Sequence, residues 1–96
     1  MRRNNTQPLK TIIESFIKEM KLEQKLKEAD IVSCWEEIVG KTVAKNTRSI
    51  YIKNKVLFVH LNSSVIRHEL SMLKTSLIEA VNKRSGEQLI SDIVLR

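Results

Sequence analysis

The stretch that most constrains the fold is "SIYIKNKVLFVHL", residues 49–61, in which β-branched and aromatic residues flank Asn54 and Lys55. Asn tolerates the left-handed backbone that a two-residue hairpin turn requires. The two flanking runs are therefore predicted to pair as an antiparallel β-hairpin. This turn sets a register of four facing pairs, which are Lys53 with Val56, Ile52 with Leu57, Tyr51 with Phe58, and Ile50 with Val59.

The hairpin has two chemically different faces, because successive side chains of a strand point to opposite sides of the sheet. One face is apolar and is predicted to line the core: Ile50, Ile52, Leu57, Val59 and Leu61. The other face carries a mixture of aromatic, basic and polar side chains: Ser49, Tyr51, Lys53, Val56, Phe58 and His60. Only the first face is expected to need a covering layer of helices.

Two helices are predicted before the hairpin. The first runs over residues 8–20, where apolar residues recur every three or four positions: Leu9, Ile12, Ile13, Phe16, Ile17 and Met20. We expect its apolar side to cover the sheet, the alternative being that it docks on a partner helix. The second runs over residues 23–39, with Trp35 anchored in the core and Gly40 as a C-cap of positive φ. Residues 42–45 are expected to add a further helical turn.

After the hairpin we predict one long helix and a last strand. The helix spans residues 62–86, with Asn62, Ser63 or Ser64 as its N-cap. Its buried stripe is predicted to be Ile66, Leu70, Leu73, Leu77 and Val81. The segment "LISDIVLR" then forms the third strand.

The fold class that follows is α+β, in the order α-α-β-β-α-β. We expect a three-stranded mixed sheet with the helices packed mainly on one face. A chain of 96 residues suits one domain, which we place at residues 8–96 after a flexible N-terminus of residues 1–7.

Positive charge is concentrated in the middle of the chain. The net charge is +6, and no Asp or Glu lies between Glu37 and Glu69. The same window contains six Lys and Arg residues: Lys41, Lys45, Arg48, Lys53, Lys55 and Arg67. Such a surface favours a polyanionic partner, and the alternative is a solvated cationic surface that aids solubility.

Tyr51, Phe58 and His60 on the second hairpin face suggest how a nucleic acid would bind. Bases of a single strand stack on exposed rings while neighbouring cations meet the phosphates. Alternatively, the rings pack under the first helix or form a dimer contact. The predicted nucleic-acid-binding residues are therefore these three together with the six cations of the basic window, and Trp35 and Gly40 are predicted to be structural.

Other chemistry is not expected. Cys34 has no partner cysteine, and Glu36 and Glu37 nearby disfavour a reactive thiolate. His60 and His68 have no carboxylate or Cys at metal-ligand spacing. The chain has two glycines and no phosphate-binding or nucleophile motif. We expect no catalytic residues, no cofactor, no metal and no small-molecule substrate. No apolar run approaches the roughly 18 residues of a membrane helix, so we expect no membrane partner and a cytoplasmic location.

The ordered set of Trp35 with "EEIVG", "VAKNT", "VLFVHLNSS", "ELSMLKTSLIEAVN" and "ISDIVLR" resembles the DciA family over roughly residues 20–96. The short length and the "IVLR" ending look most like members from Bacteroidetes-type bacteria. The resemblance implies a compact KH-like domain that binds DNA, associates with the DnaB-type replicative helicase and assists its loading during DNA replication. Many members carry an additional basic, disordered tail. The sequence ends at Arg96 without one, so a DNA-binding role that depends on the tail is not expected.

Two other functions remain open from the sequence. One is a general KH-like RNA-binding or ribosome-associated module, although the chain lacks the G-x-x-G loop by which KH domains clamp a nucleic-acid backbone. The other is a structural adaptor with no nucleic-acid role. The basic window favours single- or double-stranded DNA, or RNA, as a partner over the adaptor function.

Overall fold

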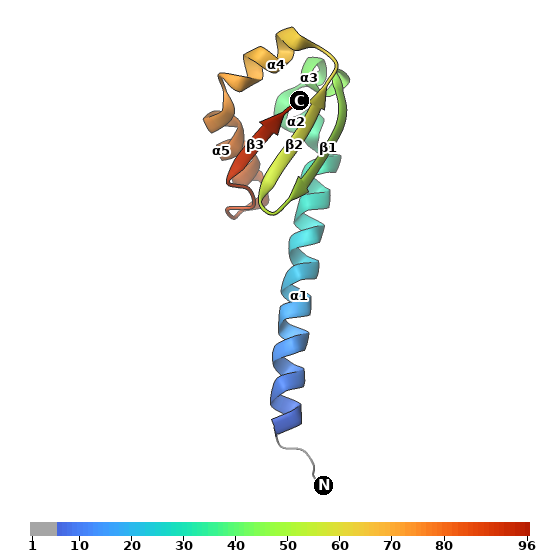
Figure 1. Ribbon diagram of the computed structural model, residues 1–96, viewed down its shortest axis with the longest axis vertical. Helices are drawn as coiled ribbons and strands as arrows, with labels where there is room; N and C mark the ends of the chain where they lie inside the picture. The colour runs from blue at the N-terminus through green and yellow to red at the C-terminus, as the bar shows by residue number, and fades with distance from the viewer. Residues whose placement is uncertain (1–5) are drawn as a thin grey trace.

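The chain folds into a small head and a long helix that projects from it, with overall extents of 66 × 21 × 20 Å (Figure 1). This computed structural model describes residues 6–96. The expected flexible N-terminus, residues 1–7, falls mostly outside the described residues and stays a prediction.

The elements follow the predicted order of helical and strand regions, α-α-β-β-α-β, and the α+β class is confirmed. In chain order they are α1 (Thr6–Ser33), α2 (Trp35–Val39), α3 (Lys41–Lys45), β1 (Thr47–Lys53), β2 (Val56–Leu61), α4 (Ser64–Ser71), α5 (Lys74–Ser85) and β3 (Asp92–Leu95).

The hairpin forms with the predicted turn and register. Asn54 and Lys55 both have positive φ angles, 51° and 64°, as a two-residue hairpin turn demands. All four predicted pairs face one another across β1 and β2. Strand β3 pairs with β2 in parallel, so the sheet is mixed, with the strand order β1-β2-β3. A register shift between Thr47 and Ser49 makes Arg48 the extra residue of a β-bulge.

One face of the sheet packs against the helices and contains the core. Leu57, Val59 and Ile93 are fully buried there, together with Ile31 of α1 and Val81 of α5. In Figure 1 the helices lie behind the sheet, and no helix lies in front of it. The predicted arrangement of helices mainly on one face is therefore confirmed.

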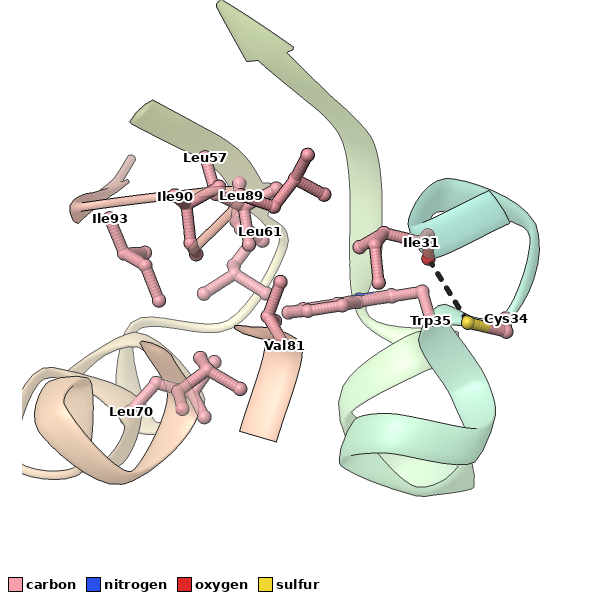
Figure 2. Close-up of a cluster of buried hydrophobic side chains, with 12 residues drawn as sticks. Ile31, Cys34, Trp35, Leu57, Leu61, Leu70, Val81, Leu89, Ile90 and Ile93 are labelled. Atoms are coloured by element: carbon pink, nitrogen blue, oxygen red, sulfur yellow. Dashed lines mark hydrogen bonds between the residues drawn. The ribbon is translucent and has the colours of Figure 1, made fainter. Parts of the chain in front are cut away.

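Trp35 joins three elements beside this core. Its side chain is only 4% exposed, and Figure 2 shows its ring extending from α2 toward Val81. The Trp35 indole Nε1 donates a hydrogen bond to Thr47 Oγ1 at 3.0 Å, and Thr47 Oγ1 donates to the Val43 carbonyl at 2.8 Å. This chain of bonds links α2, α3 and the start of β1, with the indole N–H satisfied as a buried donor requires.

Three local predictions at helix ends are confirmed. Gly40 lies between α2 and α3 with φ 90°, and Gly86 follows α5 with φ 81° in the left-handed conformation. Ser63 is the N-cap of α4, because its hydroxyl accepts a hydrogen bond from the Ile66 N–H at 3.2 Å.

The predicted division of the first helical region is wrong. Residues 8–20 and 23–33 form one continuous helix, α1, because the segment "MKLEQK" around their junction, residues 20–25, contains no Gly or Pro to end it. The expected core role of residues 9–20 is also wrong. Their apolar side chains are exposed, because the sheet and the other helices contact only the C-terminal part of α1 (Figure 1).

The predicted single helix after the hairpin is two helices, α4 and α5. Helical hydrogen bonding is interrupted at Met72 and Leu73, whose N–H groups bond three residues back to Glu69 and Leu70. The bend keeps Leu70 in the core but turns Leu73 outward, where it is exposed. The predicted burial of Leu73 is therefore wrong.

Candidate nucleic-acid interface

The face of the sheet that no helix covers carries a pair of stacked aromatic rings. Tyr51 of β1 and Phe58 of β2 have ring centroids 4.9 Å apart and ring planes 13° from parallel. The His60 ring lies 6.4 Å from that of Tyr51, at an interplanar angle of 27°. Tyr51 is 42% exposed, whereas Phe58 and His60 are partly buried. The predicted aromatic residues are thus together on an open face, and they do not pack under α1.

Arg96 extends this group and was missed in the sequence. Its guanidinium carbon lies 5.4 Å from the centre of the Phe58 ring, within reach of a cation–π contact. The Arg96 N–H donates to the Val59 carbonyl, and its own carbonyl accepts from the Leu61 N–H. These bonds continue the pairing of β3 with β2. The period-2 alternation of "DIVLR" would have put Arg96 on the open face, had the parallel pairing with β2 been known.

Three of the predicted cations lie at one end of this sheet. Lys41 and Lys45 begin and end α3, and Arg48 is the bulged residue of β1. All three side chains are exposed. The backbone hydrogen bond from the Asn62 N–H to the Asn46 carbonyl, at 2.8 Å, holds α3 against this end of the hairpin. His60 and Arg96 lie at the same end of the open face.

The other predicted strand cations lie at the hairpin tip, where acidic side chains accompany them. Lys53 is in the same cross-strand row as Asp92, because Val56 pairs with both residues. Lys55 Nζ donates to the Gln88 carbonyl at 3.4 Å, and Lys55 and Glu87 line the same hollow. The two ends of the open face therefore differ in charge, and the end beside α3 is the more cationic.

Arg67 lies apart from the open face. It lines a hollow of about 330 Å³ with His68 and Lys74 of α4 and α5, and with Leu95, which faces the helix layer. The Arg67 Nε is buried and has no hydrogen-bond partner among the described residues. Lys74 is a further cation of this hollow that sequence reasoning missed, because it follows the unpredicted break between α4 and α5.

The six cations of the basic window are absent from the ion pairs in the part of the chain that the structure describes. The ion pairs found lie on the helix side, where Lys27 pairs with Glu23 and Glu87, and Arg84 pairs with Asp30 and Glu37. Hydrogen bonding to Glu37 raises the pKa of Arg84, and hydrogen bonding to Glu87 raises that of Lys27.

Cys34 is a structural residue of the core. Its side chain is buried, and its Sγ lies 3.7 Å from the Ile31 carbonyl oxygen, as the dashed line in Figure 2 marks. Burial raises the pKa of the Cys34 thiol, with a smaller contribution from the carboxylates of Asp30 and Glu37. The thiol is thus protonated at neutral pH, which is the opposite of what nucleophilic or redox chemistry needs.

Residues 6–96 contain no cluster of three or more His, Cys, Asp or Glu side chains placed to hold a metal ion. Every helix in the same range is too short or too polar to traverse a lipid bilayer.

A comparison with known families decides the kinship of the chain. Residues 8–95 match the family model described as "Dna[CI] antecedent, DciA". The chain belongs to the DciA family. It is also 30% identical, over 63 residues, to a "UPF0232 protein" of Corynebacterium glutamicum (strain R). That match covers 66% of this DciA-family chain and 35% of the Corynebacterium protein, so the chain spans about a third of that relative's length. The narrower likeness to Bacteroidetes-type members of the DciA family stays a prediction.

Proposed function

We propose that this protein is a non-catalytic accessory factor of DNA replication, which binds nucleic acid and assists loading of the DnaB-type replicative helicase on DNA. Membership of the DciA family supports the helicase part of the proposal. The stacked Tyr51 and Phe58 rings on an uncovered sheet face are the observation that carries the nucleic-acid part. A cytoplasmic location is part of the same proposal.

In the proposed complex, a single strand lies across the open face of the sheet. Its bases stack on Tyr51, the more exposed of the paired rings, each stacked base contributing about 1–3 kcal/mol. The phosphates lie toward Lys41, Lys45 and Arg48, because these three cations are exposed and are in no ion pair among the described residues. Arg96 contributes a further cation beside Phe58.

Lys53, Lys55 and Arg67 have lesser parts in this proposal. Asp92 and Glu87 lower the positive potential around the two hairpin lysines. Arg67 lies on the helix side of the sheet edge, so it reaches a phosphate only if the strand passes around that edge.

The test is complex formation between the purified chain and the replicative helicase, with and without single-stranded DNA, at low salt. We expect the two proteins to co-elute in size-exclusion chromatography, and single-stranded DNA to increase the fraction in complex. Absence of a complex in both conditions would refute the helicase function. Equal or tighter binding to RNA, with no helicase complex, would favour the RNA-binding alternative, and failure to bind helicase, DNA or RNA would favour the adaptor.

The matched control in this experiment is Met72→Ala. Met72 lies at the corner between α4 and α5 and is exposed, on neither the open sheet face nor α3. We expect this variant to bind DNA as the unchanged protein does.

A further inference from the structure

The projecting half of α1 carries a continuous apolar stripe in contact with nothing else in the described structure. Six large side chains form it, each between 45% and 64% exposed: Leu9, Ile12, Ile13, Phe16, Ile17 and Met20. A single helix in water gains stability mainly by packing its apolar face, so a stripe of this kind calls for a partner. We propose that α1 pairs through this stripe, in antiparallel orientation, with α1 of a second copy of this chain.

The exposed area is large enough for such a pair. A large side chain has roughly 200 Å² of surface, and the six are about half exposed, so the stripe presents on the order of 600 Å² per copy. Two copies would then bury about 1,200 Å², which reaches the range of stable interfaces. Monomeric soluble proteins rarely expose contiguous apolar patches larger than a few hundred Å², and larger patches mark interaction sites. A stripe of this kind is also self-complementary, as a twofold pair requires.

The antiparallel orientation follows from where the head lies. Met20 and Ile31 are 11 residues apart, three turns of helix, so they share one side of α1. Ile31 is fully buried against the head, and Lys27, one turn before it, pairs with Glu87 of the head. The head therefore stands on the same side of α1 as the apolar stripe.

A parallel pair would bring two heads into one space, because each head occupies the stripe side of its own helix. In an antiparallel pair, each helix lies along the other's stripe, and its N-terminal end reaches the partner's head. The two heads then lie at opposite ends of the pair. This arrangement also separates two basic heads, since residues 34–96 contain ten Lys and Arg but only six Asp and Glu.

The pairing is tested by sedimentation velocity over a range of protein concentrations. We expect the unchanged chain to dimerise and Phe16→Glu to weaken the dimer at least about 30-fold, because it places a charge in the centre of the apolar contact. Ile13→Lys is a second variant with the same expected result. Both side chains are exposed in the single chain, so the circular dichroism of the head should remain native.

Met72→Glu is the matched control. Met72 is 66% exposed and Phe16 is 63% exposed, but Met72 lies on the head, away from the stripe. We expect Met72→Glu to dimerise as the unchanged chain does. A chain that is monomeric at all concentrations would overturn the proposal, and so would a dimer that Phe16→Glu and Ile13→Lys leave intact. If the stripe binds only a helix of a different protein, the purified chain would be monomeric at all concentrations.

The orientation has its own readout. With Cys34→Ala as background, spin labels at Lys83→Cys on the two heads should lie roughly 40 Å or more apart, the length of α1 at 1.5 Å per residue. A short label distance would overturn the antiparallel arrangement. Pairing does not depend on the proposed function, so Tyr51→Ala combined with Phe58→Ala should leave the dimer unchanged.

Discussion

The two faces of the hairpin come from the same 13 residues, but one is covered by helices and the other is not (Figure 1). One face is closed by helices, and its Leu57 and Val59 are fully buried. The face with Tyr51 and Phe58 has no covering element, and its rings stack on one another. One face therefore provides the free energy that holds the head together. The other is left available for a ligand.

The difference teaches that the side chains of the buried core and those proposed to bind a ligand lie on opposite faces of one sheet. Residues 6–96 form one sheet, and their helices cover one side of it (Figure 1). Large side chains on the uncovered side contribute less to folding, so their exposure there favours a binding role. Substitutions on the closed face should therefore change mainly the free energy of unfolding. Substitutions on the open face should change mainly the affinity for nucleic acid.

The largest effect is expected from the closed face. Leu57→Ala removes a fully buried side chain from the core and should lower the free energy of unfolding by about 2–5 kcal/mol. Tyr51→Ala removes a half-exposed ring and one cross-strand aromatic contact, and should cost only about 1 kcal/mol. Urea denaturation of the two variants measures both values. Equal losses would contradict the division between the faces.

A smaller effect is expected from the cations at the α3 end of the open face. Replacing Lys41, Lys45 and Arg48 together by Ala should weaken binding to single-stranded DNA and reduce the slope of log K against log salt by about 2. Lys55→Ala should change that slope least, because its ammonium group is already bonded to the Gln88 carbonyl. Fluorescence anisotropy titrations at several salt concentrations check this. A larger slope change for Lys55→Ala would show that the strand crosses the hairpin tip instead.

The smallest effect is expected on the pH dependence of stability, through the buried thiol of Cys34. The folded pKa of Cys34 is raised above its ordinary value of 9.0, chiefly by burial. The unfolded thiol therefore ionises first, and the contribution of Cys34 to stability is complete below pH 9 and is lost as the pH rises through the folded pKa. We expect a decline in stability above pH 9 that is shallower in Cys34→Ala. Identical alkaline unfolding of the two proteins would contradict the buried, protonated thiol.

Local chemistry made much of the head predictable from the sequence. The Asn54-Lys55 turn and the period-2 alternation determine the hairpin register, and Gly40 occupies the positive-φ position assigned to it. These features depend on neighbours in the chain, so one sequence suffices to read them. The opposite charges that Asp92 and Glu87 bring to the hairpin tip were not predicted, because they come from the segment after α5.

The long-range arrangement of α1 could not be predicted in the same way. Apolar periodicity predicts that residues 9–20 form a helix with an apolar side, and they do. Periodicity does not show what that side packs against. Residues 9–20 were expected to cover the sheet, but they lie in the part of α1 that projects away from it (Figure 1). Arg96 was missed for a related reason, since its place beside Phe58 depends on the parallel pairing of β3 with β2.

The most direct test of the central claim is the affinity for single-stranded DNA of the double variant Tyr51→Ala, Phe58→Ala, measured by fluorescence anisotropy at fixed low salt. We expect the affinity to fall by at least about tenfold, since one stacked base contributes about 1–3 kcal/mol. Circular dichroism should confirm that the variant is folded, and Met72→Ala should bind as the unchanged protein does. Unchanged affinity in the folded double variant would contradict the claim that the open sheet face binds nucleic acid.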